Sequence, residues 1–437
     1  MTSKVARNAS WIIGCKLVQS IVGFILNLLT ARFLGTSKFG SISYAMAVVS
    51  FVVPIMRLGF SHIMVQEIVQ NPEREGKALG TGIFLNFVSS LCCIIGVVSF
   101  AFIANPGETE TVIVCGLYSV KLMFEACDLM TYWYQAKLMS KYSAIVNLVV
   151  HFLVMGYRIY LLATSKSVYW FAVTAALDYL LGCIGIYIIY HFKKTQNLSV
   201  SLKLGKELFN KGKHYILSSM MVMIFAETDK IMLKGLIDSS ATGLYSTATV
   251  LAGATGFFFS AIIDSFRPWI FEVQKTDEEL FKKRLKMLYS FIIYLSLLQS
   301  LIMTIFAKPI VLLAYGEQYY DSIGALQIVV WYTTFSYLGS VRNIWILAND
   351  KQKYLWLINL LGAIANVILN VGLIPFLGIY GAAIASLVTQ IFTNVIVGYI
   401  IKPIRPNNAI MVSSLNPNCC LEAFRKLLKK EPKDQKN

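Results

Sequence analysis

The chain has 437 residues, of which 57% are apolar and 14% are charged, whereas an average soluble protein carries about 25% charged residues. This composition excludes disordered chains, collagen-like chains and nucleic-acid-binding arms, and it indicates a polytopic membrane protein. We therefore attribute the formal charge of +16 to cations in loops that orient the membrane helices. We expect no nucleic acid as a partner.

The predicted elements are all transmembrane helices, because the apolar runs are close to the roughly 20 residues that cross a bilayer and lack the alternation of barrel strands. We predict twelve spans, at 11–34, 40–57, 80–103, 111–135, 143–163, 169–191, 215–236, 242–265, 287–307, 323–348, 355–375 and 380–401.

The distribution of lysine and arginine predicts the orientation of these spans. Most of the cations fall in segments that share one side, and the other side holds only Arg32, Lys38, Lys166, Lys234 and Lys308. Because cytoplasmic loops carry the excess of cations, both termini are predicted to be cytoplasmic. The outer loops are short, which argues against a glycosyltransferase or polymerase, and we expect no enzyme activity.

The spans divide into two groups of six. We predict an N-terminal six-helix lobe at 1–192, a basic cytoplasmic linker at 193–214, a C-terminal six-helix lobe at 215–401 and a basic cytoplasmic tail at 402–437. The linker is also compatible with a solvated loop that faces anionic lipids. The tail has an amphipathic basic stretch typical of segments that lie on the membrane.

A weak internal repeat supports this division. The segment FLGTSKFGSISYAMAV (33–48) aligns with GLIDSSATGLYSTATV (235–250), which pairs Gly40 with Gly243 and Ser37 with Ser240. Both segments lie at the same point of a six-span half, so the halves would be parallel repeats around a central cleft. We interpret this as a carrier that rocks one lobe against the other; two lobes of a structural pore is the alternative.

Charged residues inside the spans are the candidate functional residues, because a charge is costly in the bilayer centre. In the span 111–135, Lys121, Glu125 and Asp128 share one helical face, which continues to Tyr118, Tyr132 and Gln135. Such a polar and aromatic face would suit the hydroxyls and rings of a sugar chain. The alternative is a structural network in which Lys121 neutralises Glu125.

Other spans carry further charges. In 215–236, Glu227 and Lys230 are spaced to pair, whereas Asp229 points elsewhere. Arg158 and Asp178, on two consecutive spans, could form one ion pair within the membrane. Lys16 and Arg342 have no acidic neighbour on their own helix, so they are candidates either to receive a phosphate or pyrophosphate or to reach the inner headgroups.

Sequence motifs for ATP hydrolysis and metal catalysis, such as a P-loop or HExxH, do not occur in the chain, and we expect no cofactor and no metal. The energy for transport would then come from an ion gradient or from downhill consumption of the substrate.

Several segments resemble the Wzx-type polysaccharide flippases of the MATE-like multidrug/oligosaccharidyl-lipid/polysaccharide exporter superfamily. They are NASWIIGCKLVQ and TARFLGTSKFGSISYA near the start, MRLGFSHIMVQEIVQNPEREGKALGT, ETDKIMLKGLIDSSATGLYSTATV and GIYGAAIASLVTQ. The most specific element runs from Asp229 to Leu233 and is followed by Gly243 and Tyr245, and the Asn-Pro-Glu loop at 71–73 distinguishes the chain from drug-exporting relatives.

The resemblance implies a MATE-like fold, a location in the bacterial inner membrane and export of undecaprenyl-pyrophosphate-linked oligosaccharide for O-antigen or capsule synthesis. It also implies membrane lipids, a polysaccharide polymerase and chain-length machinery as partners. A multidrug/cation antiporter of the same fold is the alternative function, and a non-transporting scaffold for the assembly machinery is an alternative of another class.

Overall fold

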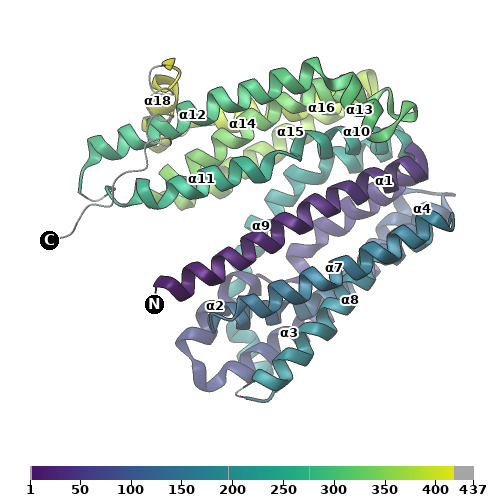
Figure 1. Ribbon diagram of the computed structural model, residues 1–437, viewed down its shortest axis with the longest axis vertical. Helices are drawn as coiled ribbons and strands as arrows, with labels where there is room; N and C mark the ends of the chain where they lie inside the picture. Colours follow the sequence, from purple (N-terminus) through teal and green to yellow (C-terminus); the bar gives the residue numbers. More distant parts are fainter. Residues whose placement is uncertain (1, 195, 275, 418–437) are drawn as a thin grey trace. The chain divides into compact units, whose positions relative to one another are not determined.

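The computed structural model describes residues 2–194, 196–274 and 276–417; in the first helix it describes the side chains at position 14 and from position 17 onward. The described residues form helices and turns, with no β-strand among them. They divide into two compact units, Met1–Gly243 and Leu244–Asn437. In Figure 1 the first unit runs from purple to teal and the second from teal to yellow.

Unit 1 contains nine helices among its described residues and the first residues of a tenth. The α-helices are α1 (Thr2–Met56), α2 (Phe60–Gln70), α3 (Glu75–Ala104), α4 (Thr109–Ser119), α5 (Lys121–Glu125), α6 (Met130–Ala136), α7 (Ser140–Ala163), α8 (Val168–Lys193) and α9 (Leu202–Leu236), with 3₁₀ turns η1 (Pro72–Arg74) and η2 (Ala126–Leu129). Helix α1 packs against α4, α7 and α9, and α7 lies along α8 (Figure 1). The helix α10 (Ser239–Gly253) crosses the boundary between the units.

The first two predicted spans form the single long helix α1, which is broken at Gly35. This residue has φ 77° and ψ 173°, a conformation that glycine adopts at little cost because it lacks a Cβ atom. The break falls between the predicted spans 11–34 and 40–57, so the sequence places the discontinuity correctly.

The predicted span 111–135 is interrupted in the structure. It consists of α4, α5, the 3₁₀ turn η2 and α6, which follow one another with αR backbone at their junctions. A 3₁₀ stretch within a helix often marks a functional hinge or a strained sequence. This turn carries Asp128, and it follows directly after Glu125.

The two segments of the internal repeat pack against each other within unit 1. A Cβ atom on Gly40 would lie 1.7 Å from the Ser239 carbonyl oxygen, and one on Gly243 would lie 2.1 Å from the Thr36 carbonyl oxygen. The Ser240 hydroxyl also donates a hydrogen bond to Thr36 Oγ1 over 2.7 Å. The contact is reciprocal, and the small residues let the two backbones approach closely, as in other membrane helix pairs.

The predicted linker 193–214 is only partly a connection, because α9 begins within it at Leu202. The extended part runs along the start of α3, where Gly76 N donates to Gln196 Oε1 over 3.1 Å and Ser201 N donates to Thr81 Oγ1 over 3.0 Å. The linker is therefore fixed to unit 1 at several points. Helix α9 itself packs on α1, α2 and α3.

Unit 2 contains the remaining helices. They are the rest of α10, then α11 (Gly256–Phe271), α12 (Glu278–Ile305), α13 (Ala307–Tyr315), α14 (Ser322–Ala348), α15 (Leu355–Leu377), α16 (Ile379–Ile391), α17 (Val397–Ile400) and α18 (Arg405–Ser413), with short turns η3 (Glu317–Tyr319), η4 (Gln352–Tyr354), η5 (Phe392–Ile396) and η6 (Lys402–Ile404). Helix α14 packs on α12 and α16, and the core includes a stacked pair of rings, Phe259 and Tyr337, with centroids 4.0 Å apart.

Eight helical stretches in the described residues are long and apolar enough to cross a membrane. One of them, Leu17–Gln70, covers most of the first two predicted spans. The predicted spans 111–135, 215–236 and 323–348 fall outside these stretches; they are helical, but the first is interrupted and the second is rich in charge. The count of twelve spans stays a prediction, and the fold is an all-α polytopic membrane fold.

Candidate functional site

Glu125, which is almost fully buried, lies between two cations in unit 1. Arg57, the residue that follows α1, donates to Glu125 Oε1 from Nε over 3.2 Å and from Nη2 over 2.7 Å. Lys121 Nζ lies 3.6 Å from Glu125 Oε2, one helical turn away. The predicted neutralisation of Glu125 by Lys121 is therefore present, but Arg57 makes the closer contact.

Arg57 also reaches the second carboxylate of the predicted stripe. Its Nη2 lies 3.6 Å from Asp128 Oδ2, and the Thr131 hydroxyl donates to Asp128 Oδ1 over 3.1 Å. Asp128 is one-third exposed, whereas only 2% of the Glu125 side chain is exposed. Two cations and two carboxylates thus form a network without formal net charge, which is how charges are tolerated inside a membrane protein. We call Arg57, Lys121, Glu125 and Asp128 the charge network.

Two aromatic rings flank the lysine of the charge network. Lys121 Nζ lies 5.4 Å from the centroid of the Tyr118 ring and 5.3 Å from that of the Tyr179 ring. Both distances are within the range of cation–π attraction, which strengthens when the cation is desolvated. Tyr118 belongs to the predicted stripe, whereas Tyr179 comes from α8.

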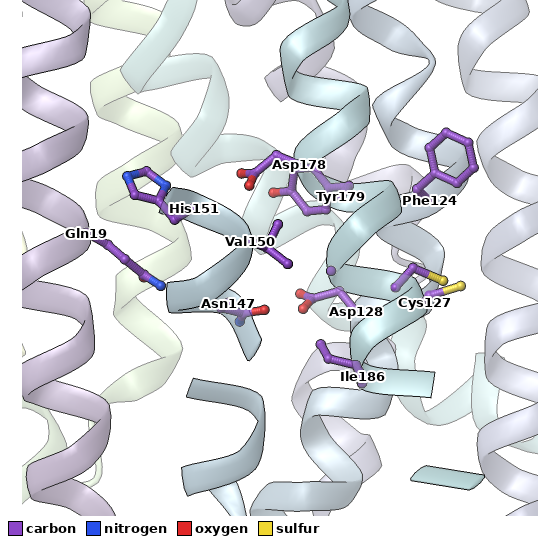
Figure 2. Close-up of a pocket in the computed structure, with 12 residues that line it drawn as sticks. Gln19, Phe124, Cys127, Asp128, Asn147, Val150, His151, Asp178, Tyr179 and Ile186 are labelled. Atoms are coloured by element: carbon purple, nitrogen blue, oxygen red, sulfur yellow. The ribbon is translucent and has the colours of Figure 1, made fainter. Parts of the chain in front are cut away.

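A cavity of about 220 Å³ lies beside the charge network within unit 1. Asp128 and Asp178 both line it, and so do His151, Asn147 and Tyr179 (Figure 2). Drug-sized ligands occupy pockets of about 300–1,000 Å³, so this cavity suits water molecules or a small cation and is too small for an oligosaccharide.

The predicted ion pair between Arg158 and Asp178 is not formed. Among the described residues Arg158 has no carboxylate within ion-pair distance; its Nε donates to Thr174 Oγ1 over 3.1 Å. Thr174 and Asp178 are one turn apart on α8, so the axial offset between α7 and α8 decides which of them Arg158 meets. Asp178 faces the cavity instead, where His151 also lies (Figure 2).

Two charged residues of α9, Glu227 and Lys230, form the ion pair that their spacing predicts. Lys230 Nζ lies 2.8 Å from Glu227 Oε2, which confirms the predicted pair. Asp229 is buried at 5% exposure. Lys16 lies on α1 outside the residues whose side chains are described.

Arg342 lies on α14 in the interior of unit 2. Its side chain is largely buried, with 6% exposure for the residue, and its Nη1 donates to the Thr393 carbonyl oxygen over 2.8 Å. Its Nε has no hydrogen-bond partner in the described part of the chain. In this structure the guanidinium is therefore buried inside unit 2, and its role as a phosphate ligand stays a prediction.

The C-terminal end of α9 carries an ion pair that the sequence does not predict. Lys234, counted as an outer-loop cation, is buried and lies 2.5 Å from Glu108 Oε2. The Lys234 ammonium and the Thr111 hydroxyl both donate to the Glu108 carboxylate, which lowers the pKa of Glu108. This pair ties the end of α9 to the start of α4.

The opposite end of α9 is held by a second set of charges. The buried Glu67 of α2 accepts from Arg74 Nη2 over 2.6 Å and from Lys211 Nζ over 3.0 Å. Asn71 of the Asn-Pro-Glu loop donates to Glu67 Oε1 over 3.1 Å. The segment that carries the resemblance, which contains Glu67 and Asn71, is therefore tied to α9 through Lys211.

The sequence does not single out Arg57, Tyr179 or His151 as candidate site residues. Arg57 ends a predicted span, where a cation is normally expected to reach the headgroups, so nothing local distinguishes it. His151 lies within an apolar run of α7, and its position in the chain indicates only a buried side chain. Each of these residues becomes a candidate for the functional site only because the fold brings it next to residues that are distant in sequence.

The described residues therefore form a polytopic helical membrane protein whose unit 1 holds the charge network beside a small polar cavity. The model of the family described as "Polysaccharide biosynthesis protein" matches residues 5–274, which is more than half of the chain, and the chain belongs to this family. No curated protein sequence matches it.

Solved structures with the same fold cover nearly the whole chain. A lipid II flippase, MurJ, in an inward closed conformation has a TM-score of 0.69 at 13% identity and covers 96% of this chain and 93% of its own. An inward-facing multidrug resistance MATE family transporter of the MOP superfamily has a TM-score of 0.62 at 15% identity, over 90% and 95%. An outward-facing one has a TM-score of 0.57 at 11% identity, over 93% and 96%. The fold is therefore MATE-like, as the resemblance implies.

Proposed function

We propose that this protein is a flippase that moves undecaprenyl-pyrophosphate-linked oligosaccharide repeat units across the bacterial cytoplasmic membrane by alternating access, for O-antigen or capsule synthesis. The membership of a polysaccharide biosynthesis family supports the substrate class. The fold supports the mechanism, because one structure with this fold is described as a lipid II flippase.

The observation that carries the proposal is the position of Arg57 in the charge network. Its side chain is 31% exposed, although it is hydrogen-bonded to the buried Glu125. A guanidinium in this position can turn part of its fork towards a diphosphate, for which its planar geometry is suited. Lys121, between two tyrosine rings, would supply a second positive charge and an aromatic surface for the sugar.

We propose a coupling role for Glu125 from the same geometry. If a diphosphate draws Arg57 away, Glu125 keeps only Lys121, 3.6 Å from its Oε2. A buried carboxylate that loses its closest cation favours uptake of a proton. Substrate binding and proton uptake would then accompany each other, and Asp229, also buried, is the second candidate for this role.

Complementation tests the proposal. Arg57→Gln and Lys121→Ala, produced at normal levels in a flippase-deficient strain, are expected to lose most of the surface polysaccharide, whereas Arg57→Lys keeps a part of it. Lys77→Ala, which removes an exposed cation, is the matched control and is expected to complement fully. Full complementation by both Arg57→Gln and Lys121→Ala would refute the assignment of the site.

One observation favours a second candidate, a multidrug/cation antiporter. The cavity in unit 1 is lined by two carboxylates, Asp128 and Asp178, and by the Tyr179 ring, and this combination attracts a small cation of the kind that an antiporter exchanges for its drug. Resistance to cationic dyes upon expression, without any rescue of polysaccharide, would favour this function over the flippase.

A further inference from the structure

A second and larger cavity lies in unit 2. Its volume is about 1260 Å³, and it opens where the charged start of α12, the end of α14 and the short helix α18 meet. Both α14 and α18 pack on α12 (Figure 1). Pockets for small molecules are typically about 300–1,000 Å³, so there is room here for a large ligand.

Helix α18 forms a fixed wall of this cavity. Pro406, Ala409, Ile410 and Ser413 line it, and their spacing places them on one helical face. The other face is anchored, because Tyr289 donates to Asn407 Oδ1 over 3.0 Å.

The cavity lies at the level where the helices begin to be apolar. Residues 278–286 of α12 are mostly charged, whereas 287–305 contain no Asp, Glu, Lys or Arg. Trp345, near the end of α14, lines the cavity at the same level. Tryptophan is enriched at the boundary between headgroups and hydrocarbon, so the change in composition and Trp345 are both typical of that level.

The wall carries cations that its carboxylates do not neutralise. Glu278 and Glu279 pair with Lys282, over 3.0 Å and 3.1 Å, and the carboxylate of Asp277 accepts from Leu280 N over 2.8 Å.

Two lysines of the wall remain for a ligand. Lys286 has no ion pair in the described part of the chain. The Lys351 ammonium lies 4.5 Å from the centroid of the Trp345 ring and donates to the Pro403 carbonyl oxygen over 2.6 Å, and it forms no ion pair with a described carboxylate. Both ammonium groups can therefore still pair with an anionic group of a ligand.

We propose that this cavity binds the headgroup of an acidic phospholipid, whose phosphate contacts Lys286 and Lys351. Basic pockets between transmembrane helices at the membrane surface are known to bind anionic headgroups. The wall also contains Phe281, Met287 and Ile410 next to the lysines, and this mixture suits an amphiphile better than a free phosphate. The proposal does not depend on the flippase function.

Thermal unfolding of the full-length protein in a neutral detergent tests the site. Dioleoylphosphatidylglycerol is expected to raise the melting temperature in a saturable way, whereas dioleoylphosphatidylcholine does not. Lys286→Gln should raise the half-saturating lipid concentration about fivefold, which is the effect of removing one cation near a membrane surface. Ala409→Trp, which fills the cavity without changing a charge, should raise it at least as much.

The control is Lys203→Gln, which removes an exposed lysine of unit 1 and should leave the half-saturating concentration within twofold of the wild type. An equal rise of the half-saturating concentration in Lys203→Gln and Lys286→Gln would show that the lipid is attracted by charge alone and has no specific site. An unchanged half-saturating concentration in Ala409→Trp would show that the lipid binds outside this cavity. Stabilisation by phosphatidylcholine, or full stabilisation by inorganic pyrophosphate alone, would also overturn the proposal.

Discussion

Replacement of Glu125 by glutamine is the most direct test of the charge network. The change keeps the shape of the side chain and removes its charge, so Arg57 and Lys121 lose the carboxylate that lies 2.7 Å and 3.6 Å from them. Breaking a buried ion pair from one side costs about 3–5 kcal/mol, because the remaining charge stays uncompensated. Since Arg57 is 31% exposed, and water partly screens it, we expect the lower end of this range, about 3 kcal/mol.

This free energy corresponds to a fall in melting temperature on the order of 6–12 °C for a unit of this size. The assay is thermal unfolding of purified Glu125→Gln and Arg57→Gln and of the double variant. Because the residues are in contact, the double variant should recover about 1–3 kcal/mol relative to the sum of the single losses. A Glu125→Gln variant as stable as Lys77→Gln, or strictly additive losses, would refute the view that Arg57 is the main partner of Glu125.

Three further predictions concern other parts of unit 1. Gly40→Ala should destabilise the protein by at least about 1–3 kcal/mol, because its Cβ would meet the Ser239 carbonyl at 1.7 Å, whereas Gly235→Ala meets nothing within 4 Å and should be tolerated; thermal unfolding of the pair of variants compares them. The lowered pKa of Glu108 predicts that its stabilising contact with Lys234 is fully present above the ordinary value of 4.5 and is lost as the pH falls through the lower folded value. Glu108→Gln should therefore flatten this acid dependence in melting curves recorded from neutral pH downward, and an unchanged slope would contradict the pairing. Asp178→Asn should change the stability by less than about 1 kcal/mol, since no ion pair holds Asp178 in the described part of the chain; a loss as large as that of Glu125→Gln would reinstate the pair with Arg158.

The membrane class and the charged stripe could be predicted from the sequence, because both depend on local properties. Runs of apolar residues predict spanning helices through their length alone, and the spacing of Lys121, Glu125 and Asp128 places them on one face. The repeat also identified Gly40 and Gly243 as equivalent positions, and the structure gives the reason, which is reciprocal contact of their backbones.

The partners of the charges could not be predicted in the same way. Arg57 and Glu125 are 68 positions apart, and which cation reaches a buried carboxylate depends on how the helices are rotated and shifted along each other. The same reason explains why Arg158 meets Thr174 and why Arg342 turns into the interior of unit 2.

The sequence by itself determined that this is a helical membrane protein with charges inside its spans, because the cost of placing charges and unpaired backbone groups in lipid acts on each segment separately. Only the tertiary structure decided which of these charges neutralise one another, which of them face a cavity and which are sealed in a core. Those outcomes depend on packing between distant helices, and a change of one helical turn is enough to exchange one partner for another.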